Sequence, residues 1–235
     1  MHPLICAHCG EWDPEPDTGA GARLLRCSFC GLTRPFLRLP LLCVTGPSGT
    51  GKSTVARALL EGLRERCVVL EQDLLWVGGL RDPADDHRLF RSTWLRTAAM
   101  VQQSGRPVVL CGTVVPPELE HLPERALFDG VHYLALTCEP EVLAERLRAR
   151  PAWRGWHEER IIETLEYQDW LLAEADRLHP PVSLLETTGR PLSETAEAVL
   201  RWVDARLSGP SGEGRPRRTR ERAPGDPEAL HVDTA

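Results

Sequence analysis

The sequence contains no asparagine and only one lysine, Lys52, although it has 28 basic residues in all. The other basic residues are therefore arginines. A coding bias accounts for such a skew. In so arginine-rich a chain, however, the one position that keeps a lysine indicates a need for that side chain. A compact ammonium differs from a planar guanidinium mainly where a point charge must enter a tight phosphate site.

Long apolar runs and an excess of positive charge are also missing. No segment approaches the roughly 18 apolar residues of a membrane-spanning helix, and the N-terminus has no basic stretch followed by an apolar core. The formal net charge of −6 argues against a general nucleic-acid coat. With 42% apolar and 26% charged residues, the composition is that of a globular protein, for which we expect a cytoplasmic location and no membrane partner.

Four of the eight cysteines form two C-x-x-C pairs near the N-terminus, Cys6 with Cys9 and Cys27 with Cys30. This spacing predicts a four-cysteine zinc ribbon over residues 1–36, with four free or disulfide-paired cysteines as the alternative. Because so small a unit has little core, Zn²⁺ would supply much of its folding free energy. The remaining cysteines lie in or beside apolar runs and are predicted to be small buried hydrophobic residues: Cys43, Cys67, Cys111 and Cys138.

From Leu39 onward, short apolar runs alternate with longer helical stretches. We expect strands over 39–45, 67–70, 107–111, 131–137 and 182–186, and helices over 52–66, 85–103, 117–128, 140–149, 158–178 and 193–207. This alternation predicts a five-stranded parallel sheet covered by helices on both faces, a three-layer α/β domain over residues 37–208. Residues 209–235 are rich in Gly, Pro and Arg without apolar periodicity and are predicted to be a disordered tail.

A phosphate-binding loop is predicted between the first strand and the first helix of this domain. The residues Gly46, Pro47, Ser48, Gly49, Thr50, Gly51, Lys52 and Ser53 match G-x-x-x-x-G-K-[ST]. In such a loop, backbone N–H groups and the helix N-terminus bind phosphate oxygens. We expect Lys52 to reach the β- and γ-phosphates, Ser53 to bind Mg²⁺ and Thr54 to contact the α-phosphate, so ATP and Mg²⁺ are the predicted cofactors.

Several classes of P-loop protein are excluded. GTPases read guanine through N-K-x-D, which a chain without asparagine cannot contain. Motor and AAA-type ATPases need a strand that ends in Asp-Glu. The candidate strands here end in Glu71-Gln72-Asp73, Cys111-Gly112-Thr113 and Thr137-Cys138-Glu139. Eukaryotic-type protein kinases use a different glycine loop and a catalytic asparagine.

Residues 39–207 resemble the small P-loop kinases that phosphorylate nucleosides, nucleotides or small metabolites. The resemblance rests on the P-loop, on the carboxylates Glu71 and Asp73 at the end of the second strand, and on the arginine-rich stretch 146–154 after the fourth strand. It implies transfer of the γ-phosphate of ATP to a small-molecule acceptor, with a nucleoside or nucleotide favoured. A metabolite or antibiotic hydroxyl is the alternative, as in shikimate kinase, gluconate kinase and chloramphenicol phosphotransferase.

The resemblance implies roles for the carboxylates and for the arginines. Asp73 would orient or deprotonate the acceptor, and Glu71 would contact the acceptor or, through water, Mg²⁺. Arg146, Arg150 and Arg154 would form a lid, in which Arg146 contacts the nucleotide and the other two stabilise the transferring phosphoryl group. The alternatives without a functional role are that the carboxylates are the polar start of a loop and that the arginines belong to a solvated basic helix.

Two further contact regions follow from the resemblance. Arg190, in the loop after the fifth strand, would stack on the adenine base. The acceptor site would lie between the second strand and the following helix, with Trp76, Arg91 and Trp94 as its main contacts, although Trp94 is equally well placed for the hydrophobic core. Other side chains expected in that region are Asp82, Asp86, Arg88 and Arg96.

A second hypothesis, from another functional class, is that the ribbon binds a nucleic acid or a regulatory partner. The ATP-binding domain would then control this binding. The acidic residues Glu11, Asp13, Glu15 and Asp17 disfavour nucleic acid. Four arginines surround the second cysteine pair and favour it: Arg23, Arg26, Arg34 and Arg38.

Overall fold

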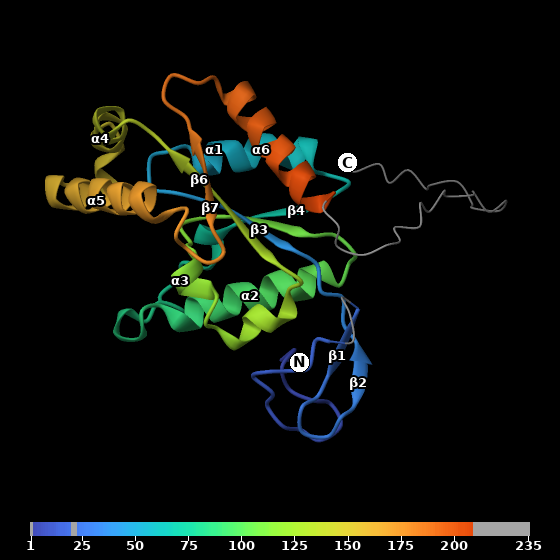
Figure 1. Cartoon of the computed structure of the whole chain (residues 1–235). Helices are drawn as coiled ribbons and strands as arrows, with labels where there is room; N and C mark the ends of the chain where they lie inside the picture. Colours follow the sequence, from blue (N-terminus) through green and yellow to red (C-terminus); the bar gives the residue numbers. More distant parts are fainter. Residues whose placement is uncertain (1, 20–22, 209–235) are drawn as a thin grey trace, which may run out of the picture.

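A computed structural model of the chain describes residues 2–19 and 23–208 (Figure 1). The tail predicted for residues 209–235 lies outside the described residues. The larger part of the structure is a parallel sheet with strand order β4-β5-β3-β6-β7, which confirms the predicted five-stranded α/β fold. Its strands are β3 (Leu41–Thr45), β4 (Val68–Glu71), β5 (Val108–Cys111), β6 (Val131–Thr137) and β7 (Val182–Glu186).

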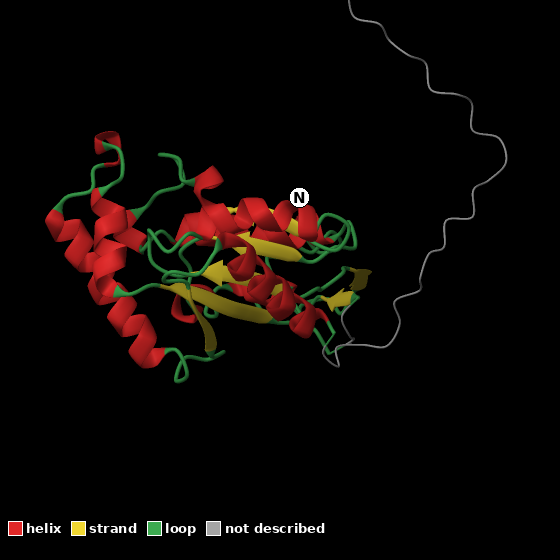
Figure 2. Cartoon of the chain, turned by 90° about the horizontal axis from the view of Figure 1, so that it is seen from above, coloured by secondary structure: helices red, strands yellow, loops and turns green. Residues whose placement is uncertain are grey.

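Helices follow the strands in turn and cover both faces of the sheet, so the domain has three layers (Figure 2). The α-helices are α1 (Lys52–Gly62), α2 (Arg88–Gln102), α3 (Pro116–Leu119), α4 (Pro140–Arg148), α5 (Glu158–Glu174) and α6 (Leu192–Leu207). Short 3₁₀ helices are η1 (Gln72–Leu75), η2 (Pro83–Asp85), η3 (Pro123–Leu127) and η4 (Ala152–Arg154).

Several helix boundaries differ from the sequence-based expectation. The helix expected over 85–103 begins at Arg88, and the one expected over 158–178 ends at Glu174. The helix expected to reach Arg66 ends at Gly62. The helix expected over 117–128 is instead α3 followed by η3, with Pro123 at the start of η3. Proline has no N–H to donate and clashes with the preceding turn, so it interrupts a continuous helix at this point.

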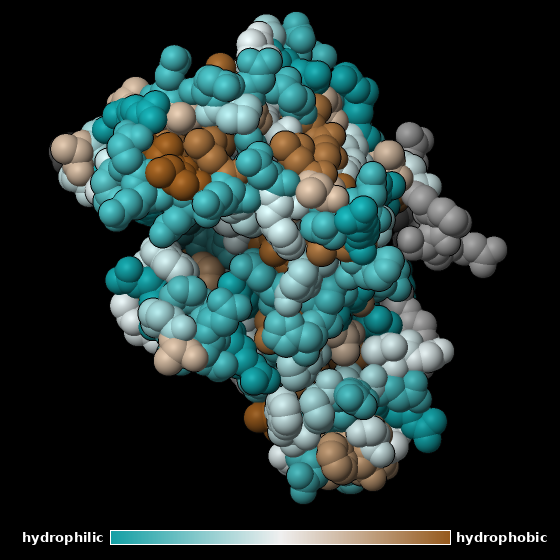
Figure 3. All heavy atoms as spheres, turned by 60° about the vertical axis from the view of Figure 1, so that its left-hand side comes forward, coloured by the Kyte–Doolittle hydropathy of each residue, from teal (hydrophilic) through white to brown (hydrophobic). Residues whose placement is uncertain are grey.

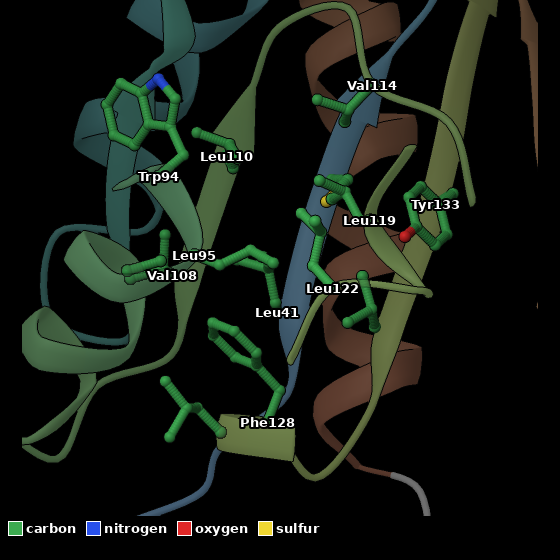
Figure 4. Close-up of a cluster of buried hydrophobic side chains, with 14 of the residues drawn as sticks. Leu41, Trp94, Leu95, Val108, Leu110, Val114, Leu119, Leu122, Phe128 and Tyr133 are labelled. Atoms are coloured by element: carbon green, nitrogen blue, oxygen red, sulfur yellow. The ribbon is translucent and has the colours of Figure 1, made fainter. Parts of the chain in front are cut away.

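Alternate residues of each strand point to opposite faces and build two separate cores. Leu41 and Cys43 join a large cluster under α2, α3 and α5, part of which is shown in Figure 4. Leu42 and Val44 join a second cluster under α1 and α6. The central strand β3 is fully buried because it lies between two neighbouring strands and two helical layers.

The N-terminal residues form a small unit that we call the cysteine ribbon, comprising described residues 2–19 and 23–36. Its strands β1 (Leu24–Arg26) and β2 (Thr33–Pro35) pair in antiparallel fashion. The ribbon lies on the same side of the sheet as α2 (Figure 1). Three of its apolar side chains belong to the large buried cluster of the α/β domain: Leu4, Leu25 and Phe36.

None of the helices in the described ranges has both the length and the apolar character that crossing a bilayer would require.

Candidate functional site

The site lies at the carboxyl ends of the parallel strands, where open α/β sheets generally bind ligands. Strand β3 leads into the loop Gly46–Gly51, and α1 begins at Lys52. Gly46 has a φ of 121°, and a Cβ atom there would collide with the carbonyl oxygen of Leu136 on β6. Only glycine therefore allows the loop to turn this close to the neighbouring strand.

The single lysine is held inside this loop. Its Nζ donates to the carbonyl oxygens of Gly46 at 2.6 Å and Pro47 at 2.8 Å. Burial lowers the pKa of Lys52 to about 8, whereas the Asp73 carboxylate raises it and Arg150 lowers it. The ammonium lies in a poorly solvated position where phosphate oxygens would stabilise its charged form.

The loop and its surroundings line a cleft of about 280 Å³. It brings together most of the residues predicted to bind the nucleotide and to act on its phosphates. They are Ser48, Gly49, Gly51, Lys52, Ser53, Thr54, Glu71, Asp73, Arg146, Arg150 and Arg154. The cleft also contains Cys111, Gly112 and Thr113 from the end of β5. Thr50 is buried and donates its hydroxyl hydrogen to Pro47 O at 2.9 Å, so it stabilises the shape of the loop.

The two carboxylates line the same cleft, although only one of them belongs to the strand at whose end both were expected. Glu71 is the last residue of β4, whereas Asp73 lies in η1. Between them, Gln72 is buried and packs so tightly on Gly112 that a Cβ at that glycine would collide with its side chain. The buried Gln72 thus fixes the start of η1 and brings Asp73 to the cleft.

A second cavity of about 750 Å³ adjoins the cleft. The two share five residues: Ser48, Asp73, Thr113, Arg150 and Arg154. Trp76 is central to the aromatic lining, with ring centroids 4.8 Å from His87 and 4.9 Å from Phe90 and with the Arg81 guanidinium 5.7 Å from its ring. Figure 3 shows the hollowed, largely hydrophilic side of the molecule that Figure 1 has on its left. Aromatic faces and cations together suit a planar or anionic ligand.

The arginines after α4 face both cavities. Burial lowers the pKa of Arg150, and so do the neighbouring charges of Arg154 and Arg160. The guanidinium of Arg150 lies 5.2 Å from the Trp156 ring and that of Arg154 lies 4.9 Å from the Trp153 ring. Within the described ranges, neither arginine forms an ion pair with a carboxylate, unlike Arg148, which binds Glu158 at 2.7 Å. This cluster of like charges is therefore ready to receive an anion.

Arg148 and Arg150 provide a matched pair of mutations. For the phosphoryl transfer that the resemblance to small P-loop kinases implies, we expect Arg150→Ala to lower the rate about 10- to 100-fold, because a guanidinium at the transferring group stabilises developing charge. Arg148→Ala removes a comparable charge outside the cleft and should change the rate by less than about twofold, since exposed ion pairs contribute little. Steady-state assays with labelled ATP would measure both. Equal losses in the two variants would contradict the assignment.

Two residues expected to contact the acceptor are engaged elsewhere. Trp94 does not line the cavity: its side chain is 2% exposed, packs in the large core and donates its Nε1 hydrogen to Gln72 O at 3.0 Å. The expectation that it contacts the acceptor is therefore dropped, and Trp94 supports η1 from behind. Arg91 does line the cavity, but it is buried and paired with Asp86 at 2.8 Å and Glu118 at 2.6 Å.

A third cavity, of about 280 Å³, adjoins the P-loop and shares Gly49, Gly51, Thr54 and Arg146 with the cleft. Arg146 and Arg190 line it together with loop residues Gly49 and Thr54. Thr187 also lines this cavity and donates its hydroxyl hydrogen to Thr137 O at 2.8 Å. Arg190 thus lines a cavity beside the P-loop, and its stacking on the adenine base stays a prediction.

The four ribbon cysteines converge on one point, with sulfur atoms all within 4.8 Å of one another. The Sγ atoms of Cys6 and Cys30 are 3.7 Å apart, and those of Cys9 and Cys27 are 3.8 Å apart. A tetrahedron with Zn–S bonds of about 2.3 Å has edges of about 3.8 Å, so the arrangement fits Zn²⁺. The backbone N–H groups of Cys9 and His8 lower the pKa of Cys6, whereas the pKa of Cys9 and that of Cys30 are raised, so these shifts do not favour the thiolate at all four positions.

Sequence reasoning missed several residues of the second cavity. His87 precedes α2, Glu118 lies in α3 and Arg160 lies in the first turn of α5. All three line the cavity, yet they come from separate elements and form no local motif. Of the other side chains expected there, Arg96 instead lies 4.0 Å from Glu124, on the ribbon side of α2. Only the tertiary fold shows which of these side chains line the cavity and which lie elsewhere.

Comparison with known proteins identifies relatives of the chain. Residues 42–171 match the protein family described as "AAA domain". Relatives in sequence include proteins that bear the name "Putative adenylate kinase". The one from Pyrococcus furiosus is 29% identical over 167 residues, covering 70% of this chain and 84% of the relative. The one from Archaeoglobus fulgidus is 33% identical over 173 residues, covering 68% and 79%.

Among solved structures, a sugar kinase from Janibacter sp. aligns with a TM-score of 0.50 over 71% of this chain and 95% of that chain. At 20% identity, this likeness shows the fold alone. The family description names an AAA domain. AAA-type ATPases nevertheless need a strand that ends in Asp-Glu, and the candidate strands of this sequence end in other residues. The matched range begins after the cysteine ribbon.

Proposed function

The chain belongs to the family described as AAA domain and is a P-loop kinase, and we propose that it transfers the γ-phosphate of ATP to a nucleoside or nucleotide. The observation that carries the proposal is the position of Asp73. This carboxylate lines both the P-loop cleft and the larger adjoining cavity, together with Arg150 and Arg154. A group in that shared wall can contact an acceptor while it faces the terminal phosphate of the donor.

On the donor side, we propose that the P-loop N–H groups hold the phosphates, with Lys52 on the β- and γ-phosphates and Thr54 on the α-phosphate. Bound Mg²⁺ would neutralise charge on the β- and γ-phosphates, and Ser53 is the side chain we propose as its ligand. Arg146 and Arg190 would contact the nucleotide in the third cavity. Glu71 lines the cleft but not the larger cavity, which favours a role on the phosphate and metal side.

On the acceptor side, the composition of the larger cavity supports a planar acceptor. Trp76, His87 and Phe90 offer ring faces and edges, and Arg81 lies near them. Arg91 would contribute mainly by holding Glu118 and Asp86 in place. A base stacked on these rings would direct its sugar or phosphate towards Asp73 and the two lid arginines.

A metabolite or antibiotic hydroxyl is the second candidate acceptor, and Asp73 suits it, like the hydroxyl of a nucleoside, better than it suits the phosphate of a nucleotide. A hydroxyl must lose its proton as it attacks phosphorus, and a carboxylate accepts that proton. A phosphate oxygen of a nucleotide carries no such proton at neutral pH.

The acceptor class is tested by a panel of nucleosides, nucleotides, sugars and amphenicol- or aminoglycoside-type alcohols with γ-labelled ATP. We expect a nucleoside or nucleotide to become labelled with a kcat/KM at least about tenfold above that of any sugar or antibiotic. Wild-type protein without acceptor is the control for ATP hydrolysis. Selective labelling of a sugar or an antibiotic would replace the leading proposal with its alternative.

We further propose that Cys6, Cys9, Cys27 and Cys30 bind one structural Zn²⁺. Elemental analysis of protein purified under reductant should give about one equivalent of zinc per chain. A variant with Cys9→Ser and Cys30→Ser, the two exposed cysteines, should lose it. Cys67→Ser is the matched control, because Cys67 is outside the cluster, and should retain the metal. Less than about half an equivalent in the wild-type protein would refute the site.

A further inference from the structure

The ribbon is joined to the kinase domain through buried apolar surface. Leu4, Leu25 and Phe36 are each at most 5% exposed and belong to the same cluster as Phe90 and Trp94 of α2. Loss of the ribbon fold would return these side chains to water, which is costly for residues of this size. The ribbon and α2 therefore share one core. Figure 4 shows residues of this core from α2 and the sheet, such as Trp94, Leu95 and Leu41.

Polar contacts fix the same junction. The amide side chain of Gln103, which caps α2, donates to Leu37 O at 2.9 Å and accepts from Leu37 N at 2.9 Å. Arg38 donates to Ala126 O at 2.9 Å and to Phe128 O at 3.0 Å. These hydrogen bonds hold the segment between ribbon and β3 against the end of α2 and against η3.

A buried carboxylate adds a third link. Glu124 in η3 is 4% exposed and accepts a hydrogen bond from the Ser92 hydroxyl. Its carboxylate also lies 3.9 Å from His2 Nε2 and 4.0 Å from Arg96 Nε. Burial and the charge of Arg96 lower the pKa of His2. Glu124 thus contacts the ribbon and two positions of α2 together.

The opposite end of α2 reaches the larger cavity. Phe90 and Arg91 line that cavity, and Trp94 holds Gln72, which precedes Asp73. The P-loop helix α1, in contrast, packs in the second core, on the other face of the sheet. Unfolding of the ribbon would therefore change the larger cavity, which α2 lines, more than the P-loop, which leads into α1.

We propose that the cysteine ribbon is a zinc-dependent support for α2, so that zinc at the four cysteines sets the affinity of the acceptor cavity while ATP binding is preserved. The proposal rests on the proposed function, in which the cavity beside Asp73 binds the acceptor. Without zinc, a unit with so little core of its own unfolds, and α2 loses one of its packing surfaces. The helix remains, but its first turn, with Phe90 and Arg91, is no longer held in position, and neither is η1, which Trp94 supports.

Hydrogen exchange of the full-length protein tests the proposal, before and after removal of zinc by a chelator under reductant. We expect amides of α2 to exchange about tenfold faster without zinc, whereas those of α1 change by less than about twofold. The Kd of a fluorescent ATP analogue should stay within about twofold. For an acceptor found in the panel, KM should rise about fivefold or more, with KM for ATP unchanged.

A variant separates the contact from the metal. Gln103→Ala breaks the hydrogen bonds to Leu37 and leaves the cysteines intact, so it should retain zinc and raise α2 exchange about threefold. Leu89→Ala, an exposed change at the other end of α2, is the control and should leave the ribbon end of the helix at the wild-type rate.

The outcomes distinguish this inference from the proposed function. If zinc removal leaves α2 as protected as before, or loosens α1 equally, the zinc-dependent support is wrong whatever the enzyme phosphorylates. If α2 loosens selectively but no nucleoside, nucleotide or other alcohol is labelled, the coupling stands and the proposed function fails.

Discussion

Replacement of Lys52 by alanine is expected to lower the rate of γ-phosphate transfer about a thousandfold, because a fixed positive charge at the transferring group is lost. The ammonium is positioned by two carbonyl oxygens, at 2.6 and 2.8 Å, and lines the cleft. In a chain whose other basic residues are arginines, no neighbouring lysine can replace it. Lys52→Arg should restore little activity, since a planar guanidinium does not fit where a compact ammonium is enclosed.

The single lysine also allows a direct measurement of binding. A lysine-reactive acyl-phosphate derivative of ATP should label one internal site, at Lys52, and excess ATP should prevent the labelling. Lys52→Ala should remain unlabelled there, while circular dichroism verifies that the variant is folded. Transfer by Lys52→Ala within about tenfold of the wild-type rate would contradict the role given to this residue.

The same lysine predicts a pH dependence of ATP binding. Its pKa is about 8 in the free protein, mainly because of burial, with Asp73 opposing that effect and Arg150 adding to it. Bound phosphates favour the charged form, so the pKa rises on binding. ATP affinity should therefore fall as pH rises above 8, by up to about tenfold per pH unit. Titration of Lys52→Ala with a fluorescent ATP analogue should lack this decline, and an equal decline would contradict the prediction.

The sequence predicted the fold well where the signal was local. Short apolar runs such as Leu41–Thr45 are too short for helices and lie between helical stretches, so a covered parallel sheet follows. The break at Pro123 could also have been read from the sequence, since proline rarely continues a helix. The strand order could not, because pairing of β3 with both β5 and β6 joins residues far apart in the chain.

The site divides in the same way. The P-loop is contiguous, so its spacing alone locates it. Trp94 shows the limit: helical periodicity places it one turn after Phe90, but packing decides that Phe90 lines the cavity and Trp94 does not. His87 and Glu118 meet only when α2 and α3 fold against each other. Asp73 was located on the chain, but its route to the cleft through η1 depends on the buried Gln72.

Asp73→Asn should produce the second large effect, and its size depends on the acceptor. With a hydroxyl acceptor, the carboxylate takes a proton in the transition state, and its loss should lower kcat about 100- to 1,000-fold. With a nucleotide whose phosphate oxygen attacks, no proton is transferred, and the loss should be about tenfold, from misorientation alone. Steady-state assays with the labelled acceptor from the panel would distinguish the two cases.

Asp85→Asn is the control for this change, because Asp85 is exposed in η2 and does not line either cavity. It should change kcat by less than about twofold. If Asp73→Asn also keeps wild-type kcat and KM for every acceptor, the shared wall does not act in the reaction. The acceptor would then have to approach the γ-phosphate from another side. The geometry disfavours such an approach, because Arg150 and Arg154 face the phosphate cleft and line the same wall as Asp73.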